Sequence, residues 1–282
     1  MTTASFANEN TPGGARAAMA TNETIRTLMK RRSIRAFTDQ PVSEGEVEAL
    51  ERAAQHAASS RYFNDWSAIR VTDPEVAGRL AQLGHQDYIA QAPLLYVFLI
   101  DERRNAHLAG AQGVDTSSDR FIFNTGYVFL QGQNDAILAL HAMETAANSL
   151  DLGCVILGSV INDVDALIDL LHLPALVYPV LGLAIGHPGQ EPDLKPRMDP
   201  PAQIFENRYP ELDAEGRTQD ERAGRALADF DQVVKRYYMD IRHMDAPRRS
   251  FSEIIADQAV NPGAAHEPML PSIQRQGFHL DR

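Results

Sequence analysis

Residues 94–100 are Leu-Leu-Tyr-Val-Phe-Leu-Ile, a continuous apolar run rich in aromatic and branched side chains. A run of this length and composition predicts a strand that is buried on both faces. Similar runs at 154–157 and 178–185 predict two more central strands, and residues 68–72 predict a short additional one. The longest apolar stretch, 93–100, is far shorter than the ~20 residues that cross a bilayer, so no membrane span is expected.

The clearest helix signals mark N-termini. Ser43 and Glu46 form a capping box, which predicts a helix over 44–57. Asp73 followed by Pro74 predicts the start of another helix, because proline favours the first helical position.

A long amphipathic segment predicts a helix over 126–151, and Gly153 is placed to end it. Asn162 or Asp163 is expected to cap the next helix, which should end before Pro174.

Toward the C-terminus, Thr218 and Glu221 predict a capped helix that runs through Tyr237. Beyond Met239 the chain is expected to be irregular, apart from a short amphipathic piece at 252–256.

Helices outweigh strands in this pattern, and the strands are few, short and apolar. We therefore expect an α+β fold of three layers, in which helices cover a central sheet. Residues 21–210 should form the core, and 211–282 should add a C-terminal helix and a mobile arm to the same domain. Residues 1–20 are expected to be disordered, and 103–124 to be a surface excursion.

Composition excludes several function classes. The 282 residues carry a formal net charge of −12, which argues against a nucleic-acid or anionic-membrane partner. The N-terminus lacks the apolar core of a signal peptide, and a single cysteine fits a reducing compartment. The cytoplasm is the expected location.

Common catalytic and nucleotide-binding motifs are missing from the sequence. It contains no G-x-G-x-x-G after a strand, no phosphate-binding loop of the G-x-x-x-x-G-K-[ST] type, no H-E-x-x-H and no G-x-S-x-G. The nine histidines show no metal-ligand spacing. Hydrolase and metalloenzyme functions are therefore disfavoured, and no metal is expected.

A basic segment at residues 31–35, Arg-Arg-Ser-Ile-Arg, is the first candidate binding site. Its guanidinium groups and hydroxyl could bind a phosphate through charge-assisted hydrogen bonds. The alternative is a solvated basic helix end that the helix dipole favours.

Three other segments are weaker signals. Pro196 could fix the geometry of its flanking cations, although the tripeptide 195–197 could also be a plain loop. The strand 155–159 runs into a glycine, which would let a flat ring approach the backbone, or is an ordinary strand end. The loop 59–62, Ser-Ser-Arg-Tyr, could supply hydroxyls to polar ring edges, or be a loop without function.

In their order along the chain, these segments resemble the nitroreductase family. The resemblance rests on Arg-Arg-Ser-Ile-Arg-Ala-Phe-Thr at 31–38, the Ser-Ser loop, Leu-Gly-Cys-Val-Ile-Leu-Gly-Ser at 152–159, Pro-Val-Leu-Gly-Leu-Ala-Ile-Gly-His-Pro at 179–188 and Pro-Asp-Leu-Lys-Pro-Arg at 192–197. It covers roughly residues 22–255 and is closest to the NADPH-preferring branch of nitroreductases and flavin reductases. It implies a three-layer nitroreductase-like fold with a mixed or antiparallel central sheet.

The resemblance also implies FMN as cofactor. Arg31, Arg32, Ser33 and Arg35 match the segment that holds the FMN phosphate and ribityl chain, with Arg31 in place of an expected histidine. The other implied flavin contacts are Ser59, Ser60, Arg61, Gln86, Gly158, Ser159, Lys195 and Arg197.

NADPH is implied as co-substrate. Arg242, Arg248 and Arg249 match a mobile segment whose arginines meet the 2′-phosphate of NADPH, although they could also merely solvate a loose tail. A hydride would pass from NADPH to N5 of FMN and then to a nitroaromatic, a quinone or free flavin, by a ping-pong mechanism. The flavin carries this chemistry, so no catalytic side chain is expected.

A homodimer is implied as well, because the family builds its flavin site from both subunits. The helix at 126–151 could be the core of the interface or a buried helix of one chain. Two other functions stay open: a different flavin reaction on the same fold, such as reductive dehalogenation or flavin fragmentation, and a non-catalytic flavin-binding regulator.

Overall fold

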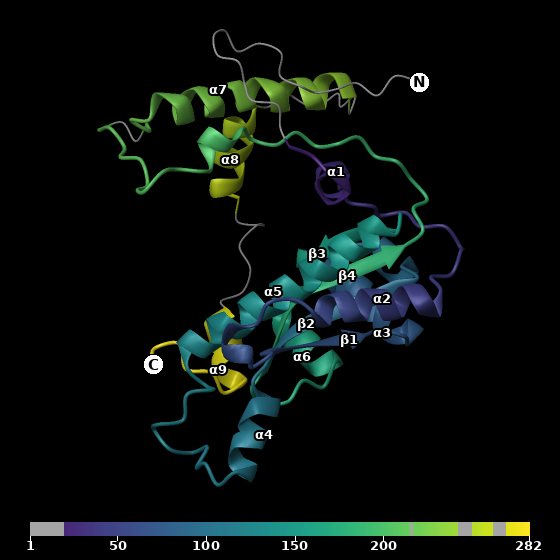
Figure 1. The fold of residues 1–282 in the computed structure, drawn as a ribbon, viewed down its shortest axis with the longest axis vertical. Helices are drawn as coiled ribbons and strands as arrows, with labels where there is room; N and C mark the ends of the chain where they lie inside the picture. Colours follow the sequence, from purple (N-terminus) through teal and green to yellow (C-terminus); the bar gives the residue numbers. More distant parts are fainter. Residues whose placement is uncertain (1–19, 215–216, 242–249, 262–268) are drawn as a thin grey trace.

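The centre of the molecule is a four-stranded antiparallel sheet with strand order β1-β2-β4-β3 (Figure 1). The computed structural model describes residues 20–214, 217–241, 250–261 and 269–282. Most of the expected N-terminal arm and Arg242, Arg248 and Arg249 therefore lie outside the described residues. The strands are β1 Trp66–Arg70, β2 Leu94–Asp101, β3 Gly153–Leu157 and β4 Val177–Gly186.

The middle strands confirm the expectation from the apolar runs. Every interior residue of β2 is buried, so both faces of this strand are covered by other elements. α5 packs across β2 and β4 with α2 beside it, while α3 packs against α6, which meets β4. The result is the expected α+β fold of helices around a central sheet.

Helices make up most of the rest of the chain. They are α1 Glu23–Lys30, α2 Glu44–Gln55, α3 Pro74–Gly84, α4 Arg103–Ala111, α5 Gly126–Ser149, α6 Val164–Leu170, α7 Glu221–Arg236, α8 Phe251–Ala259 and α9 Met269–Arg275. Short 3-10 turns lie at Ser60–Tyr62, Asp87–Gln91, Gly158–Ile161 and Pro200–Ala202, and a π-turn at Tyr237–Ile241 extends α7. Among the described residues, no helix is both long and apolar enough to cross a membrane.

Local capping signals predicted several helix starts correctly. Ser43 and Glu46 form the expected capping box of α2. The side chain of Asp73 accepts a hydrogen bond at the start of α3, whose first residue is Pro74. Asp163, and not Asn162, caps α6 by accepting a hydrogen bond from the backbone of residue 166.

Two predicted helix boundaries were wrong. Gly153 does not end α5: Asp151 takes the left-handed conformation there, with φ 57°, while Gly153 begins β3. A Cβ on Gly153 would lie 2.8 Å from the side chain of Ile34, so close packing explains this glycine. At α7 the cap is Asp220, which accepts two backbone hydrogen bonds, and not Thr218.

Two further helices were missed. α4 lies inside the segment expected to be a surface excursion, and α9 lies in the C-terminal stretch expected to be irregular. After α9 the chain returns to the core, where Phe278 is fully buried with its ring 5.0 Å from that of Phe129 on α5.

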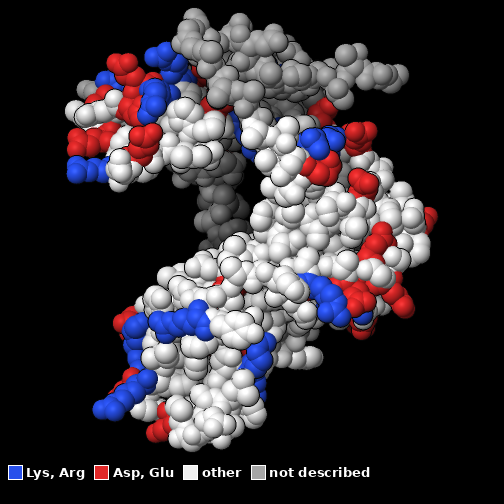
Figure 2. Space-filling view, viewed as in Figure 1, with Lys and Arg blue, Asp and Glu red and all other residues white. Residues whose placement is uncertain are grey.

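α7 and α8 form an arm that stands away from the sheet (Figure 1). They pack on each other through Phe230 and Phe251, whose ring centroids are 5.0 Å apart. Figure 2 shows that the molecule is hollowed between this arm and the body.

Glu102, the residue before α4, is an unusual buried acid. Its side chain is fully buried, and neither carboxyl oxygen has a hydrogen-bond partner among the described residues. Burial, and next the charge of Asp65, raise the pKa of Glu102 to about 9. The folded protein therefore holds a proton here that the unfolded chain releases at a much lower pH.

We predict that Gly132→Ala destabilises the fold. A Cβ at Gly132 would lie 2.6 Å from the side chain of Ile100 and 3.0 Å from the backbone oxygen of Asp65, so α5 and β2 would have to separate. The free energy of unfolding should fall by roughly 1–3 kcal/mol, as is typical of overpacking. Gly78→Ala is the matched control, because α3 has open space there, and denaturant unfolding should show it to be neutral or stabilising.

We predict that Glu102→Gln stabilises the protein increasingly as pH rises. Because the folded-state pKa is raised, the parent loses stability between the pKa of the unfolded glutamate, near 4.5, and the folded value of about 9. A neutral amide removes that loss, so the stability of the variant relative to the parent should rise between pH 5 and pH 8 by at most about 1.4 kcal/mol for each pH unit. Thermal unfolding across this range measures the difference, and a variant that parallels the parent at every pH would contradict the assignment.

Candidate functional site

The basic segment lies along the start of β3, anchored by its apolar residue. Ile34 is buried, and its backbone N–H donates to the carbonyl of Cys154 at 2.9 Å. Ser33 forms a parallel bridge with the same residue. Arg35 follows directly, exposed and without a hydrogen bond or ion pair to any described residue. The segment thus presents a free guanidinium next to a fixed backbone.

The other two arginines of this segment already have partners. Arg31 donates from Nε to the Glu144 carboxylate on α5 at 2.5 Å, and Glu144 is buried. Arg32 donates to the carbonyl of Pro192 at 2.8 Å and lies 3.5 Å from Glu191. Arg31 is therefore held against the helix, while Arg32 links the basic segment to the loop after β4.

The loop after β4, which leads to Lys195 and Arg197, is bound to the chain that follows Arg35. The backbone N–H of Thr38 donates to His187 at 2.9 Å, and that of Gly189 donates to Ala36 at 2.8 Å. Farther along, the Arg197 guanidinium donates to the carbonyls of Lys195 and Pro196 at 3.0 and 3.1 Å. The loop after β4 is thus bound to the first basic segment as far as Pro192, and Lys195 and Arg197 follow a few residues later.

A second group of predicted residues meets where β3 ends. Gly158 is exposed, and a Cβ there would meet nothing within 4 Å. The Ser159 hydroxyl is buried, lacks a described hydrogen-bond partner, and lies 3.0 Å from the Cβ position of Gly84. Gln86, two residues beyond α3, accepts a hydrogen bond from the Tyr88 hydroxyl. This edge of the sheet therefore has open space over Gly158, and beside it a hydroxyl group, that of Ser159, without a described hydrogen-bond partner.

The Ser59–Asp65 loop, which we call the serine loop, is attached to α5 at a different place. The Ser59 hydroxyl donates to Asp135 at 2.6 Å, and the Ser60 backbone N–H donates to the same carboxylate at 3.1 Å. Arg61 has φ 52°, is exposed, and lies 5.4 Å above the Tyr127 ring.

The serine loop and the basic segment lie on different sides of α5. Asp135, which holds the loop, and Glu144, which holds Arg31, are nine residues apart, or about 14 Å along the axis and half a turn round it. A single chain therefore does not bring the serine loop and the basic segment together.

Sequence reasoning missed Asp135 and Glu144. Both are buried, at 2% and 3% exposure, on α5, where they flank the buried Leu140 and Met143. An acid in phase with the apolar positions of a helix was the available signal, because a buried carboxylate requires partners.

The described cavities do not enclose the predicted residues together. A cavity of about 430 Å³ lies between β1, the start of α4 and residues 171–177, and it contains none of them. A second cavity, of about 110 Å³, includes Arg31 and Glu144. Arg35 and Gly158 are instead exposed at the surface.

Known proteins resemble this chain over nearly its whole length. The Nitroreductase family profile matches residues 28–187, and the profile of the family's C-terminal domain matches 195–281. The oxygen-insensitive NADPH nitroreductase of Salmonella typhimurium is 35% identical over 256 residues, which cover 90% of this chain and 98% of that protein. The FMN reductase [NAD(P)H] of Bacillus subtilis is 33% identical over 262 residues, covering 93% and 100%.

Solved structures agree. NfrA2 of B. megaterium superposes with a TM-score of 0.80 at 30% identity, covering 93% of this chain and 100% of its own. The NADPH:FMN oxidoreductase of Vibrio harveyi, solved with NAD+, gives a TM-score of 0.75 at 27% identity over 91% and 99% of the two chains. With the family profile matching more than half of its length, this chain belongs to the nitroreductase family.

Proposed function

We propose that this protein is an FMN-dependent oxidoreductase that uses NADPH as electron donor. The observation that carries the proposal is Arg35, which has no partner among the described residues and lies beside the cation-bearing loop after β4 in a chain of this family. Relatives named as an FMN reductase and as an NADPH nitroreductase support the choice of cofactor and donor. A cytoplasmic location would suit such an enzyme.

The basic segment fits a phosphate group. Arg35 has no partner among the described residues, Arg32 has further N–H groups beyond those used on Pro192, and Ser33 lies between these two arginines in the sequence. Lys195 and Arg197 would add positive charge from the second segment. Forked, charge-assisted hydrogen bonds of this kind suit a terminal phosphate.

The end of β3 fits a flat ring. The open space over Gly158 would let a ring lie against the backbone, and the partnerless Ser159 hydroxyl could bond a polar ring atom. Gln86 would meet the ring from α3, and Lys195 at the pyrimidine edge would stabilise negative charge that develops there.

Bound FMN would supply the redox chemistry, in which a hydride from NADPH would reach N5 and two electrons would pass to a nitroaromatic, a quinone or free flavin. The protein's residues bind and orient the reactants, and none of them has to be a nucleophile. A single cleft that serves both donor and acceptor predicts ping-pong kinetics. Arg242, Arg248 and Arg249 remain our proposed contacts to the NADPH 2′-phosphate.

A homodimer would complete the site. The serine loop and the basic segment lie on different sides of α5, so the loop of a second copy could meet the flavin held by the cations of the first. α5 also leaves large apolar side chains exposed: Tyr127 55%, Leu130 57%, Ile137 37% and Leu138 45%. Exposed apolar surface of this kind marks protein interfaces.

We predict that the purified protein binds FMN and not FAD, and that NADPH added without oxygen bleaches the flavin absorption near the visible maximum. A colourless protein that takes up no added FMN would refute the proposed function. A flavin that binds but is not bleached by NADPH would favour the non-catalytic regulator, and a product screen after bleaching would reveal dehalogenation or flavin fragmentation.

We predict that Arg35→Ala weakens FMN binding by roughly ten- to a hundredfold, because a charge-assisted hydrogen bond contributes ~1.5–3 kcal/mol. The fold should be unaffected, since Arg35 has no described partner to lose. Arg79→Ala is the control, an exposed arginine on α3 whose described hydrogen bond is to Gln82. Fluorescence titration of the apoprotein measures both, and equal affinities for parent and Arg35→Ala would make Arg35 a plain surface charge.

A further inference from the structure

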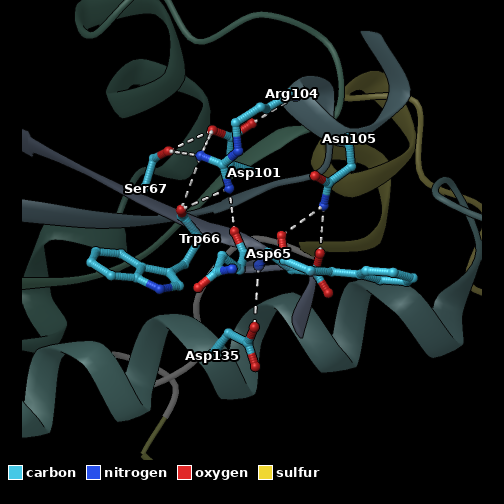
Figure 3. Close-up of polar contacts among 9 residues, drawn as sticks. Asp65, Trp66, Ser67, Asp101, Arg104, Asn105 and Asp135 are labelled. Atoms are coloured by element: carbon cyan, nitrogen blue, oxygen red, sulfur yellow. Dashed lines mark hydrogen bonds and ion pairs between the residues drawn. The ribbon is translucent and has the colours of Figure 1, made fainter. Parts of the chain in front are cut away.

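The serine loop is bound to the body of the protein by its backbone. Its amides face α5, where the Asp135 carboxylate accepts from the N–H groups of Ser60 and Asp65, each at 3.1 Å. Figure 3 shows Asp135 reaching up from the helix to the backbone of Asp65.

The carbonyl groups of the same loop are bound from the other direction, by α4. The Asn105 amide donates to the Phe63 carbonyl at 3.3 Å and to the Asp65 carboxylate at 2.6 Å. Arg104 donates to the carbonyls of Asn64 and Trp66 (Figure 3). The loop is therefore held from two sides. The Asp135 carboxylate accepts hydrogen bonds from its backbone amides, and the Arg104 and Asn105 side chains donate hydrogen bonds to its carbonyls.

Ser59 contributes to this arrangement from inside the loop. Its hydroxyl donates to Asp135 at 2.6 Å and accepts from the Asn64 backbone N–H at 2.7 Å. A serine hydroxyl has one proton to donate, and Ser59 uses it on Asp135. Its oxygen therefore ties the two ends of the loop together, while the nearby Arg61 side chain is exposed.

We propose that Asp135 is the positioning residue of the serine loop, and that Ser59 acts as its internal link and not as a direct flavin contact. Asp135 accepts three hydrogen bonds, from the Ser59 hydroxyl and two backbone amides, at a site that is only 2% exposed. The effect on flavin rests on the proposed function, whereas the order of the loop does not.

The substitution Asp135→Asn is the sharpest test of this role. Ser60 donates to one carboxylate oxygen and Asp65 to the other, so the side-chain amide of the variant must turn its NH₂ group toward one of these two backbone N–H groups. At least one of the three hydrogen bonds is lost in either orientation of the side chain, with little change in volume.

The first measurement is hydrogen exchange in the protein without flavin. In Asp135→Asn the Ser60 and Asp65 amides should exchange at least tenfold faster, and the increase should be larger than for the β2 amides, which open only with the core. Ser59→Ala should accelerate exchange at Asn64, and Ser59→Thr, which keeps the hydroxyl, should restore the parent rate. Parent rates at residues 60 and 65 in Asp135→Asn would overturn the proposal, even if FMN does not bind.

The second measurement is the FMN dissociation constant in a double-mutant cycle. Asp135→Asn and Ser59→Ala should each weaken binding by roughly tenfold, and the double variant should be no more than about twofold weaker than the weaker single variant, because both disrupt one unit. If the loss of FMN affinity in the double variant equals the product of the two single losses, Ser59 contacts the flavin directly and the internal-link role is wrong.

Glu102→Gln is the matched control for both measurements. Glu102 is a fully buried acid near Asp65, but it has no hydrogen bond to the serine loop among the described residues. In the Glu102→Gln protein, the amide exchange rates at residues 60, 64 and 65 and the FMN affinity should stay at the parent values. A loss equal to that of Asp135→Asn would show that any change in this buried acid layer loosens the loop, which would overturn the specific role of Asp135. If the parent itself binds no FMN, the proposed function fails and the exchange result alone decides the positioning role.

Discussion

α5 has to bury two carboxylates together with its apolar face, and the arrangement of the candidate site follows from how it does so. The buried part of α5 carries Leu140 and Met143, and Asp135 and Glu144, half a turn apart, lie at its two edges at 2% and 3% exposure. A buried charge without partners is strongly destabilising, so each acid needs donors from elsewhere in the chain. Asp135 obtains them from the serine loop, and Glu144 from Arg31 and His141. Two segments that bear candidate ligand contacts are thereby fixed to one helix.

Much of the fold could be predicted because its determinants are local. The buried run of β2, the capping box at Ser43 and the Asp73-Pro74 start of α3 each depend on a few neighbouring residues, and the structure confirms them. The features that were missed depend on distant contacts. α9 is only seven residues long, and the segment that follows it is held by Phe278, which packs on Phe129 about 150 residues away. Gly153 resembled a helix end, but its lack of a Cβ is required by Ile34, which comes from a different part of the chain.

The candidate site divides in the same way. The cations at 31–35 and 195–197 were visible as short motifs, yet each alone was equally consistent with solvated charge. Their relation comes from backbone hydrogen bonds between Ala36–Thr38 and His187–Gly189, which no local pattern encodes. Ser59 was also predicted as a ligand contact, from its hydroxyl and from the resemblance to the nitroreductase family. Its partners, Asp135 and the Asn64 amide, could not be predicted without the three-dimensional structure, and they make a different role more consistent with the geometry.

The pairing of Arg31 with Glu144 bears on how an acidic protein can hold an anion. The chain carries a net charge of −12, and acidic side chains gather on the side of the body where α2 lies (Figure 2). A phosphate of charge near −2 must therefore be bound by cations whose charge is not already neutralised.

Glu144 neutralises Arg31, so Arg31 adds little net charge, although its terminal N–H groups can still donate hydrogen bonds. Arg35, without a described acidic partner, keeps its full charge. Under the proposed function, the attraction for phosphate would therefore depend chiefly on Arg35 and on the cations of the second basic segment, while Arg31 would contribute mainly hydrogen bonds.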